Sequence, residues 1–154
     1  MTKPEAILHF RIPPHPHLSR VVREGVTEFA RPHGIPDEEL ALLLTALGEA
    51  IANAIEHAKA ERPIEVEVRL EADRILATVR DDGIGFEAGP GIEPTLPDPA
   101  AERGRGLPIM RRCSDIFAID SVAGKGTSVV LGRYLRPHAN AHLASERGTG
   151  RLTA

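Results

Sequence analysis

Three polar side chains interrupt one long apolar stretch of the sequence. Residues 40–55 are mostly Leu, Ala and Ile, and Glu49, Asn53 and His57 follow one another at intervals of four residues. This spacing puts the three side chains near one line on the surface of a helix. Burying a carboxylate in such a helix is costly unless the group is paired or used. The line is therefore either a solvated stripe with structural hydrogen bonds or a set of groups that serves a bound ligand.

A second polar pattern comes where a predicted strand ends. The pattern D-x-G-x-G begins at Asp81 and has its glycines at positions 83 and 85. Glycine permits positive φ and lets a ligand approach the backbone closely. The carboxylate of Asp81 would accept a hydrogen bond from a bound group. The same pattern is also a common turn, so it does not decide the function alone.

Two glycine-rich segments follow later in the chain. Gly-Arg-Gly-Leu at 104–107 opens a short predicted helix, and the free N–H groups and positive dipole end of such a turn favour phosphate. Gly-Lys-Gly-Thr at 124–127 does not meet the phosphate-loop pattern G-x-x-x-x-G-K-[ST], because its lysine is followed by glycine. Taken alone, the first segment is equally typical of a simple helix start, and the second is typical of a hairpin turn.

The elements that must position these groups alternate between strands and helices. Helical spacing of apolar residues and strand-like alternation predict strands at 6–12, 64–70, 74–79, 116–122 and 127–135, and helices at 18–30, 37–59 and 107–114. Residues 87–103 contain many Gly and Pro and no apolar period, which predicts a long loop of the kind that often serves as a lid.

Length and composition limit the classes of protein that fit. The 154 residues suit one domain. A net charge of −3 and an aromatic content of 3% disfavour a nucleic-acid-binding module. The single cysteine, Cys113, excludes an intrachain disulfide. We expect no transmembrane span, since no uninterrupted apolar run approaches about 18 residues, and the N-terminus lacks the pattern of a signal peptide. The expected location is the cytoplasm.

The order of the motifs is more specific than any one of them. E-x-x-x-N on a helix, then D-x-G-x-G, a Pro/Gly-rich loop, G-x-G-L-x-I-M and G-K-G-T together resemble the GHKL nucleotide-binding fold, above all the small anti-sigma-factor serine kinases of bacteria. The likeness covers about residues 5–135. It implies a two-layer α/β sandwich in which a mixed, mostly antiparallel sheet carries three helices on one face. We expect a histidine-kinase-like ATP-binding domain at 1–136 and a flexible tail at 137–154.

The resemblance implies that ATP and Mg²⁺ bind between the motif helix and the lid. Glu49 matches the general base of the serine kinases, and Asn53 matches the residue that ligates Mg²⁺. Asp81 matches the aspartate that takes the adenine amino group. His57 is expected to line the pocket, with plain packing as the alternative.

Other positions match the remaining contacts of the family. Gly83 and Gly85 match the turn under the base, and Thr127 matches the threonine of the adenine–water network. The phosphate-side hinge of the lid corresponds to Gly104 and Gly106, with Leu107 in the same motif. Neutralisation of the γ-phosphate charge from the lid is expected from Arg103 or Arg105.

These matches imply a protein-serine kinase that phosphorylates a small antagonist protein and sequesters a sigma factor. A homodimer through the first helix and the exposed sheet edge is expected, as in close family members. Alternatives are a nucleotide-sensing regulatory module that acts on another partner, the catalytic half of a histidine kinase, and a slow gyrase-like ATPase. Glu49 argues against the histidine kinase, where this position is usually Asn.

Overall fold

The structure is a computed structural model that describes residues 3–57, 62–85 and 106–135. Its elements follow one another as β1 (Ala6–Ile12), α1 (Leu18–Ala30), the 3-10 helix η1 (Arg31–His33), α2 (Asp37–His57), β2 (Ile64–Leu70), β3 (Arg74–Asp81), α3 (Gly106–Arg112), β4 (Ile116–Val122) and β5 (Gly126–Tyr134).

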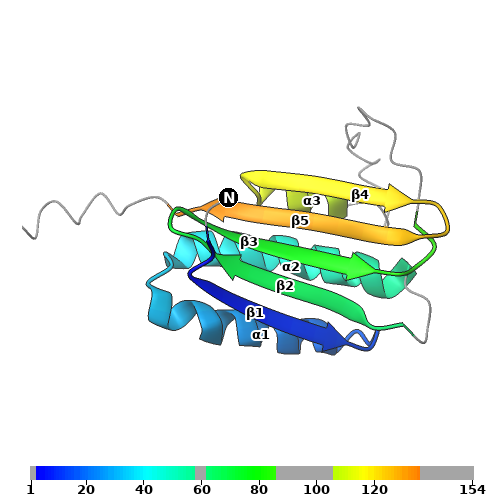
Figure 1. The fold of residues 1–154 in the computed structure, drawn as a ribbon, viewed down its shortest axis with the longest axis horizontal. Coiled ribbons are helices and arrows are strands. Elements are labelled where there is room, and N and C mark those ends of the chain that lie inside the picture. The colour runs from blue at the N-terminus through cyan, green and yellow to red at the C-terminus, as the bar shows by residue number, and fades with distance from the viewer. Residues whose placement is uncertain (1–2, 58–61, 86–105, 136–154) are drawn as a thin grey trace, which may run out of the picture.

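The five strands form one sheet that the helices cover on a single face. The strand order is β1-β2-β3-β5-β4, and each pair of neighbours among these strands is antiparallel. Helices α1, α2 and α3 lie side by side behind the sheet in Figure 1, and the face toward the viewer carries no helix. The predicted two-layer α/β architecture with a mostly antiparallel sheet is therefore confirmed.

Helix α2 supplies most of the helical side of the core. Its buried apolar side chains recur at helical spacing and pack against the inward-facing residues of the strands; they are Leu43, Ala46, Leu47, Ala50, Ile51 and Ala54. Among the described helices it is the one that is long and apolar enough to pass a length-and-composition test for a membrane span. Its contact with the sheet accounts for that apolar character, because a core helix needs the same composition.

A buried ion pair holds the N-terminal turn of α2 to β5. The Nε and Nη2 atoms of Arg133 both lie 2.7 Å from Oε2 of Glu39, and both residues are buried. Arg133 also lies 3.3 Å from Asp115. This pair sits at the end of α2 opposite Asn53 and His57, so it fixes the helix at a distance from the motif residues.

Element boundaries differ slightly from the prediction. Strand β3 runs to Asp81 instead of residue 79, α3 begins at Gly106 instead of 107, and η1 was not predicted. Helix α2 is described to His57. The expected continuation of that helix to 59, the loop 87–103 and the tail 137–154 lie outside the described residues, as does the expected domain boundary at 136.

Candidate functional site

A cavity of about 430 Å³ lies on the helical side of the sheet. Residues of helix α2, the beginning of α3 and the strands β3, β4 and β5 line this partly open cavity. The residues that line it are Ala50, Asn53, Ala54, Glu56, His57, Val79, Asp81, Gly106, Leu107, Ile119, Thr127 and Val129. The wall thus combines apolar side chains with a few polar groups, which is typical of small-molecule sites.

Asp81 lies half-buried at the end of β3, on the cavity wall. Its Oδ1 accepts a hydrogen bond of 2.8 Å from the backbone N–H of Gly83, which fixes the direction of the carboxylate. Burial raises the pKa of the Asp81 carboxyl, while the Gly83 N–H and the nearby His57 oppose this rise. A carboxylate held in this way can accept a hydrogen bond from a ligand amino group.

The glycines after Asp81 are required by the protein's own backbone. A Cβ on Gly83 would lie 2.0 Å from the backbone oxygen of His57. Gly85 has φ +60°, and a Cβ there would lie 2.2 Å from the backbone oxygen of Val122. The loop is therefore wedged between the end of α2 and the β4–β5 hairpin.

Hydrogen bonds hold the same loop on both sides. The backbone N–H of Ile84 donates to the carbonyl of His57, and the carbonyl of Ile84 accepts from the N–H of Gly124. The G-K-G-T segment thus supports the D-x-G-x-G loop, and this hydrogen bond holds the two patterns together in space.

Glu49 and Asn53 converge on the first residue of α3. A Cβ placed on Gly106 would lie 3.2 Å from Oε2 of Glu49 and 3.2 Å from both Oδ1 and Nδ2 of Asn53. The predicted line on α2 therefore turns its carboxylate and its amide toward the same point. Asn53 lines the cavity, and Glu49 lies one helical turn away against Gly106.

Thr127 faces Asp81 across the β3–β5 pair. The strand register pairs Asp81 with Thr127, and Thr127 with Ser121 of β4. The Oγ atoms of Ser121 and Thr127 lie 2.8 Å apart. Both Asp81 and Thr127 line the cavity, so a carboxylate acceptor and a hydroxyl lie next to each other on its wall.

The structure places the other predicted site residues as follows. Leu107 lines the cavity, and so does His57, whose side chain is exposed. The predicted residues Arg103, Gly104 and Arg105 lie outside the described part of the chain.

Sequence reasoning missed several lining residues. Val79, Ile119 and Val129 line the cavity, and strand alternation predicts that they face inward but does not separate a cavity wall from packed core. Ser121 does not line the cavity but contacts Thr127; it was missed because a serine in a half-buried strand carries no signal until its cross-strand partner is known.

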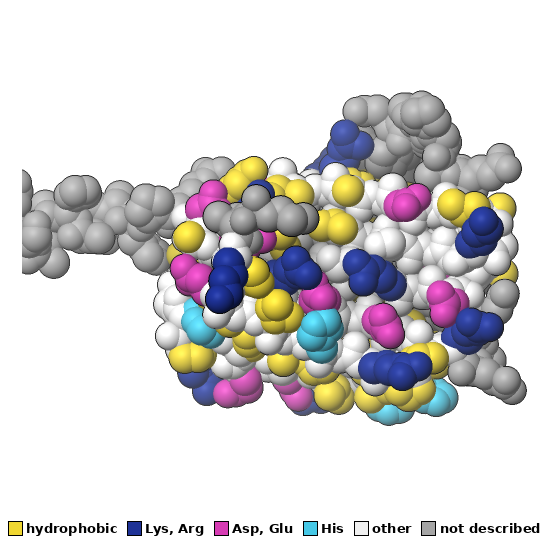
Figure 2. Space-filling model, viewed as in Figure 1, with side chains coloured by type: hydrophobic (Ala, Val, Ile, Leu, Met, Phe, Trp, Pro, Cys, Tyr) yellow, Lys and Arg dark blue, Asp and Glu magenta, His cyan; other side chains and the backbone are white. Residues whose placement is uncertain are grey.

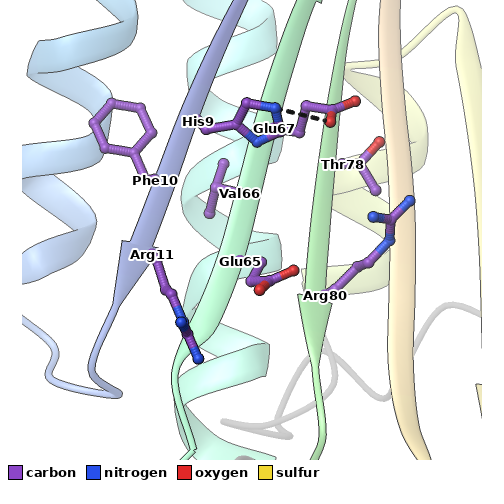
Figure 3. A pocket seen from close by; sticks show the side chains of 8 residues that line it. All are labelled: His9, Phe10, Arg11, Glu65, Val66, Glu67, Thr78 and Arg80. Atoms are coloured by element: carbon purple, nitrogen blue, oxygen red, sulfur yellow. Dashed lines mark ion pairs between the residues drawn. The ribbon is translucent and has the colours of Figure 1, made fainter.

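A second hollow of about 380 Å³ lies on the open face of the sheet, over β1, β2 and β3. Figure 3 shows His9, Arg11, Glu65, Glu67, Thr78 and Arg80 projecting from the strands there. The His9 and Glu67 side chains lie 3.2 Å apart. Acidic and basic side chains are interspersed on this face (Figure 2). None of the four sequence motifs lies in this hollow, and within the described ranges no cluster of three or more His, Cys, Asp and Glu could hold a metal ion.

Comparison with known proteins matches most of the chain to one family. The sequence model of the histidine kinase-like ATPase domain family matches residues 12–133. The anti-sigma F factor of Bacillus subtilis (strain 168) is 32% identical over 105 residues, which cover 64% of this chain and 71% of the relative. The anti-sigma F factor of Bacillus thuringiensis (strain Al Hakam) is 36% identical over 104 residues, with the same coverage.

Two solved structures share the fold. The RsbU and RsbW domains of a Mycobacterium tuberculosis protein align with a TM-score of 0.66 and 24% identity over 87% of this chain. The histidine kinase domain of a blue-light activated histidine kinase from Erythrobacter litoralis aligns with a TM-score of 0.50 and 21% identity over 65% of this chain. This chain spans about a third of the first solved chain and less than half of the second, at 34% and 46%.

Proposed function

The chain belongs to the histidine kinase-like ATPase domain family, and on that premise we propose that it is an ATP-dependent protein-serine kinase that also acts as an anti-sigma factor. Relatives that are 32% and 36% identical over the aligned residues, which cover 71% of their own length, carry the name anti-sigma F factor. We assign it two protein partners, a sigma factor that it sequesters and a small antagonist protein that it phosphorylates on serine.

The observation that carries this proposal is the convergence of Glu49 and Asn53 on Gly106. A base for a hydroxyl nucleophile and a ligand for a phosphate-bound metal must face the same reacting phosphate. Both side chains come within 3.2 Å of the position that a Cβ would occupy on Gly106, at the start of α3. Gly106 and Asn53 line the cavity of about 430 Å³.

The far end of that cavity suits an adenine base. We propose that Asp81 accepts a hydrogen bond from the adenine amino group and that the Thr127 hydroxyl binds the neighbouring edge of the base, directly or through water. Val79, Ile119 and Val129 supply apolar surface in the same cavity. His57, exposed beside the Asp81 loop, completes the wall on the α2 side.

The donor set of the site fits Mg²⁺. This ion prefers oxygen ligands and keeps several waters and substrate phosphates around it, so one amide oxygen from the protein is sufficient. We propose that Asn53 Oδ1 is that ligand. Bound there with ATP, Mg²⁺ would neutralise charge on the phosphates.

The proposed chemistry places Glu49 as the general base. The carboxylate takes the proton of the substrate serine hydroxyl while the serine oxygen forms its bond to the γ-phosphorus. The bond from the γ-phosphorus to the bridging oxygen breaks, and ADP leaves. We assign phosphate contacts to the backbone of Gly106, which its position next to both Glu49 and Asn53 supports. Arg103, Gly104 and Arg105 are assigned to the phosphate side of the lid by sequence.

Transfer of labelled γ-phosphate to the antagonist protein tests the proposal. Glu49→Gln removes the base and keeps the shape, so we expect the transfer rate to fall by about 10²–10⁴-fold while ATP affinity is retained. Glu38→Gln is the matched control, because Glu38 is exposed in the first turn of α2 at the other end of the helix. A transfer rate that Glu49→Gln leaves unchanged would contradict the assignment.

The same assay separates the alternatives. ATP binding without phosphate transfer to any protein would favour a nucleotide-sensing regulatory module that acts on another partner. Slow release of phosphate without an acceptor would favour an ATPase.

The remaining assignments concern the setting in which the kinase works. We propose that the protein acts in the cytoplasm as a homodimer, and that neither nucleic acid nor a membrane is among its partners. On the open face, acidic and basic side chains are interspersed, whereas a nucleic-acid surface would be broadly basic.

A further inference from the structure

Ser121 of β4 is a buried serine that lies beside Thr127, its paired residue on β5. Its exposed fraction is 8%, and it is not among the residues that line the cavity, whereas its cross-strand partner Thr127 is. The two hydroxyl oxygens lie 2.8 Å apart, and either hydroxyl is able to donate. A hydroxyl that lines the cavity is thus held from the neighbouring strand by a hydroxyl that does not line it.

Ser121 also contacts the glycine that precedes Thr127. Its oxygen lies 3.3 Å from the backbone carbonyl of Gly126 and 2.8 Å from the Thr127 hydroxyl, so its one proton has two acceptors within reach, and Thr127 is the nearer. Gly126 has φ +99°, and a Cβ there would lie 2.1 Å from the backbone oxygen of Asp81. Ser121 therefore contacts two neighbouring residues of β5. Gly126 packs closely against the end of β3, and Thr127 pairs with Asp81 across the sheet.

A threonine side chain has three staggered χ1 rotamers, and only the rotamer that reaches Ser121 keeps this hydroxyl pair. A hydroxyl has one proton to give and two lone pairs. When Ser121 donates to Thr127, the proton of Thr127 is left for a ligand. When Thr127 donates to Ser121, and Ser121 donates to the Gly126 carbonyl, only the lone pairs of Thr127 remain available to a ligand. The state of this pair decides whether the cavity presents a donor or an acceptor beside Asp81.

We propose that Ser121 is a positioning residue that directs the Thr127 hydroxyl toward the nucleotide base and strengthens the preference for adenine over guanine. This inference rests on the proposed function. Adenine presents an amino donor next to a ring-nitrogen acceptor, which match the Asp81 carboxylate and a donating Thr127. Guanine presents a carbonyl next to an N–H, the reverse order. A site built for one polar pattern rejects the other, because the mismatch leaves buried polar groups unpaired.

A double-mutant cycle on nucleotide affinity tests the proposal. Calorimetry with Mg·ATP and Mg·GTP would compare wild type, Ser121→Ala, Thr127→Val and the double variant. One neutral hydrogen bond corresponds to about a threefold to tenfold change in affinity. We expect Ser121→Ala to weaken ATP binding and to reduce the ATP-to-GTP preference by such a factor, but to have no further effect in the Thr127→Val background.

The control and the conservative variant make the result specific. Ser128→Ala is the matched control, since Ser128 follows Thr127 on β5 and so points to the opposite face of the sheet. Ser121→Thr keeps the hydroxyl and should restore part of the preference. If Ser121→Ala lowered ATP affinity by the same factor in the wild type and in Thr127→Val, the role of Ser121 would be merely structural and the proposal would be overturned. An ATP affinity that Ser121→Ala leaves unchanged would overturn it as well.

A second readout needs no nucleotide. Side-chain couplings from NMR should show a single χ1 rotamer for Thr127 in the wild type and averaging in Ser121→Ala. A wild type that binds no ATP would overturn the proposed function and the adenine preference together. An averaged Thr127 in the wild type would overturn the positioning role alone.

Discussion

Asp81 lines the candidate site, and its burial makes its negative charge unfavourable for the stability of the folded chain. Burial raises the pKa of its carboxyl, so the charged form is disfavoured in the folded state. For a group whose folded pKa is raised, the contribution to stability is present below the unfolded pKa and is lost as pH rises through the folded pKa. At neutral pH the charge of Asp81 therefore destabilises the folded protein, at the residue that we propose binds adenine.

Asp81→Asn should separate these two effects. The asparagine keeps an oxygen for the Gly83 N–H but carries no charge, so the melting temperature of the nucleotide-free protein should rise at neutral pH. The stabilisation by added Mg·ATP should disappear. Thermal unfolding with and without ATP measures both, and an unchanged ATP-induced shift would contradict the adenine role. In the wild type, the ATP-induced shift should shrink as pH falls through the raised pKa of Asp81.

Gly83 gives a steric prediction at the same scale. Gly83→Ala would put a Cβ 2.0 Å from the backbone oxygen of His57. A backbone atom moves aside less easily than the end of a flexible side chain, so the collision destabilises the fold. We expect a loss of about 1–3 kcal/mol in the free energy of unfolding, measured by urea titration. Gly48→Ala is the control, because its Cβ would meet only the Arg23 side chain at 3.6 Å. That variant should be neutral or stabilising by up to about 1 kcal/mol.

Among the secondary-structure elements, helix α2 is fixed to strand β5 by a buried ion pair. Arg133 and Glu39 are paired while buried, so the removal of one partner leaves an uncompensated charge. Arg133→Met should lower the free energy of unfolding by about 3–5 kcal/mol. The exposed pair of Arg31 and Glu28 is the comparison, and Arg31→Met should cost at most about 1 kcal/mol.

Adding Glu39→Leu to Arg133→Met tests the reason for that loss. The double variant has no buried carboxylate left at position 39, so it should recover part of the stability. Equal stability of the single and double variants in urea titration would show that the loss comes from packing and not from the unpaired charge.

Elements were predictable where pattern and packing agree. The alternation at Ile64–Leu70 and the apolar helical spacing of α2 gave these elements correctly, because each buries one face. The boundaries at Asp81 and Gly106 were missed by one or two residues, since polar site residues end the apolar pattern before the backbone hydrogen bonds end. Positive φ and close ligand approach were predicted for Gly83 and Gly85, and Gly85 has φ +60°. The structure adds that a Cβ at these positions would collide with the backbone of His57 and Val122, which no local pattern reveals.

At the scale of the whole molecule, the open edge of the sheet and the first helix carry exposed apolar groups. Ile7 of β1 is 45% exposed and Val21 of α1 is 49% exposed. We propose that these elements form the homodimer contact, so light scattering should give about twice the 16.6 kDa of one chain. Ile7→Glu and Val21→Glu should shift the mass toward the monomer. Val122→Glu, at an equally exposed apolar position on β4, should leave the mass unchanged.

The two hollows of the molecule make opposite predictions about where ATP binds. The helical-side cavity holds Asn53, Asp81 and Thr127, whereas the open-face hollow holds Glu67 and Thr78. Titration of ¹⁵N-labelled protein with Mg·ATP, followed by amide chemical shifts, tests this most directly. The largest shifts should fall on Asn53, Asp81 and Thr127 and spare Glu67 and Thr78. No shifts at all, or shifts concentrated on the open face, would contradict the account.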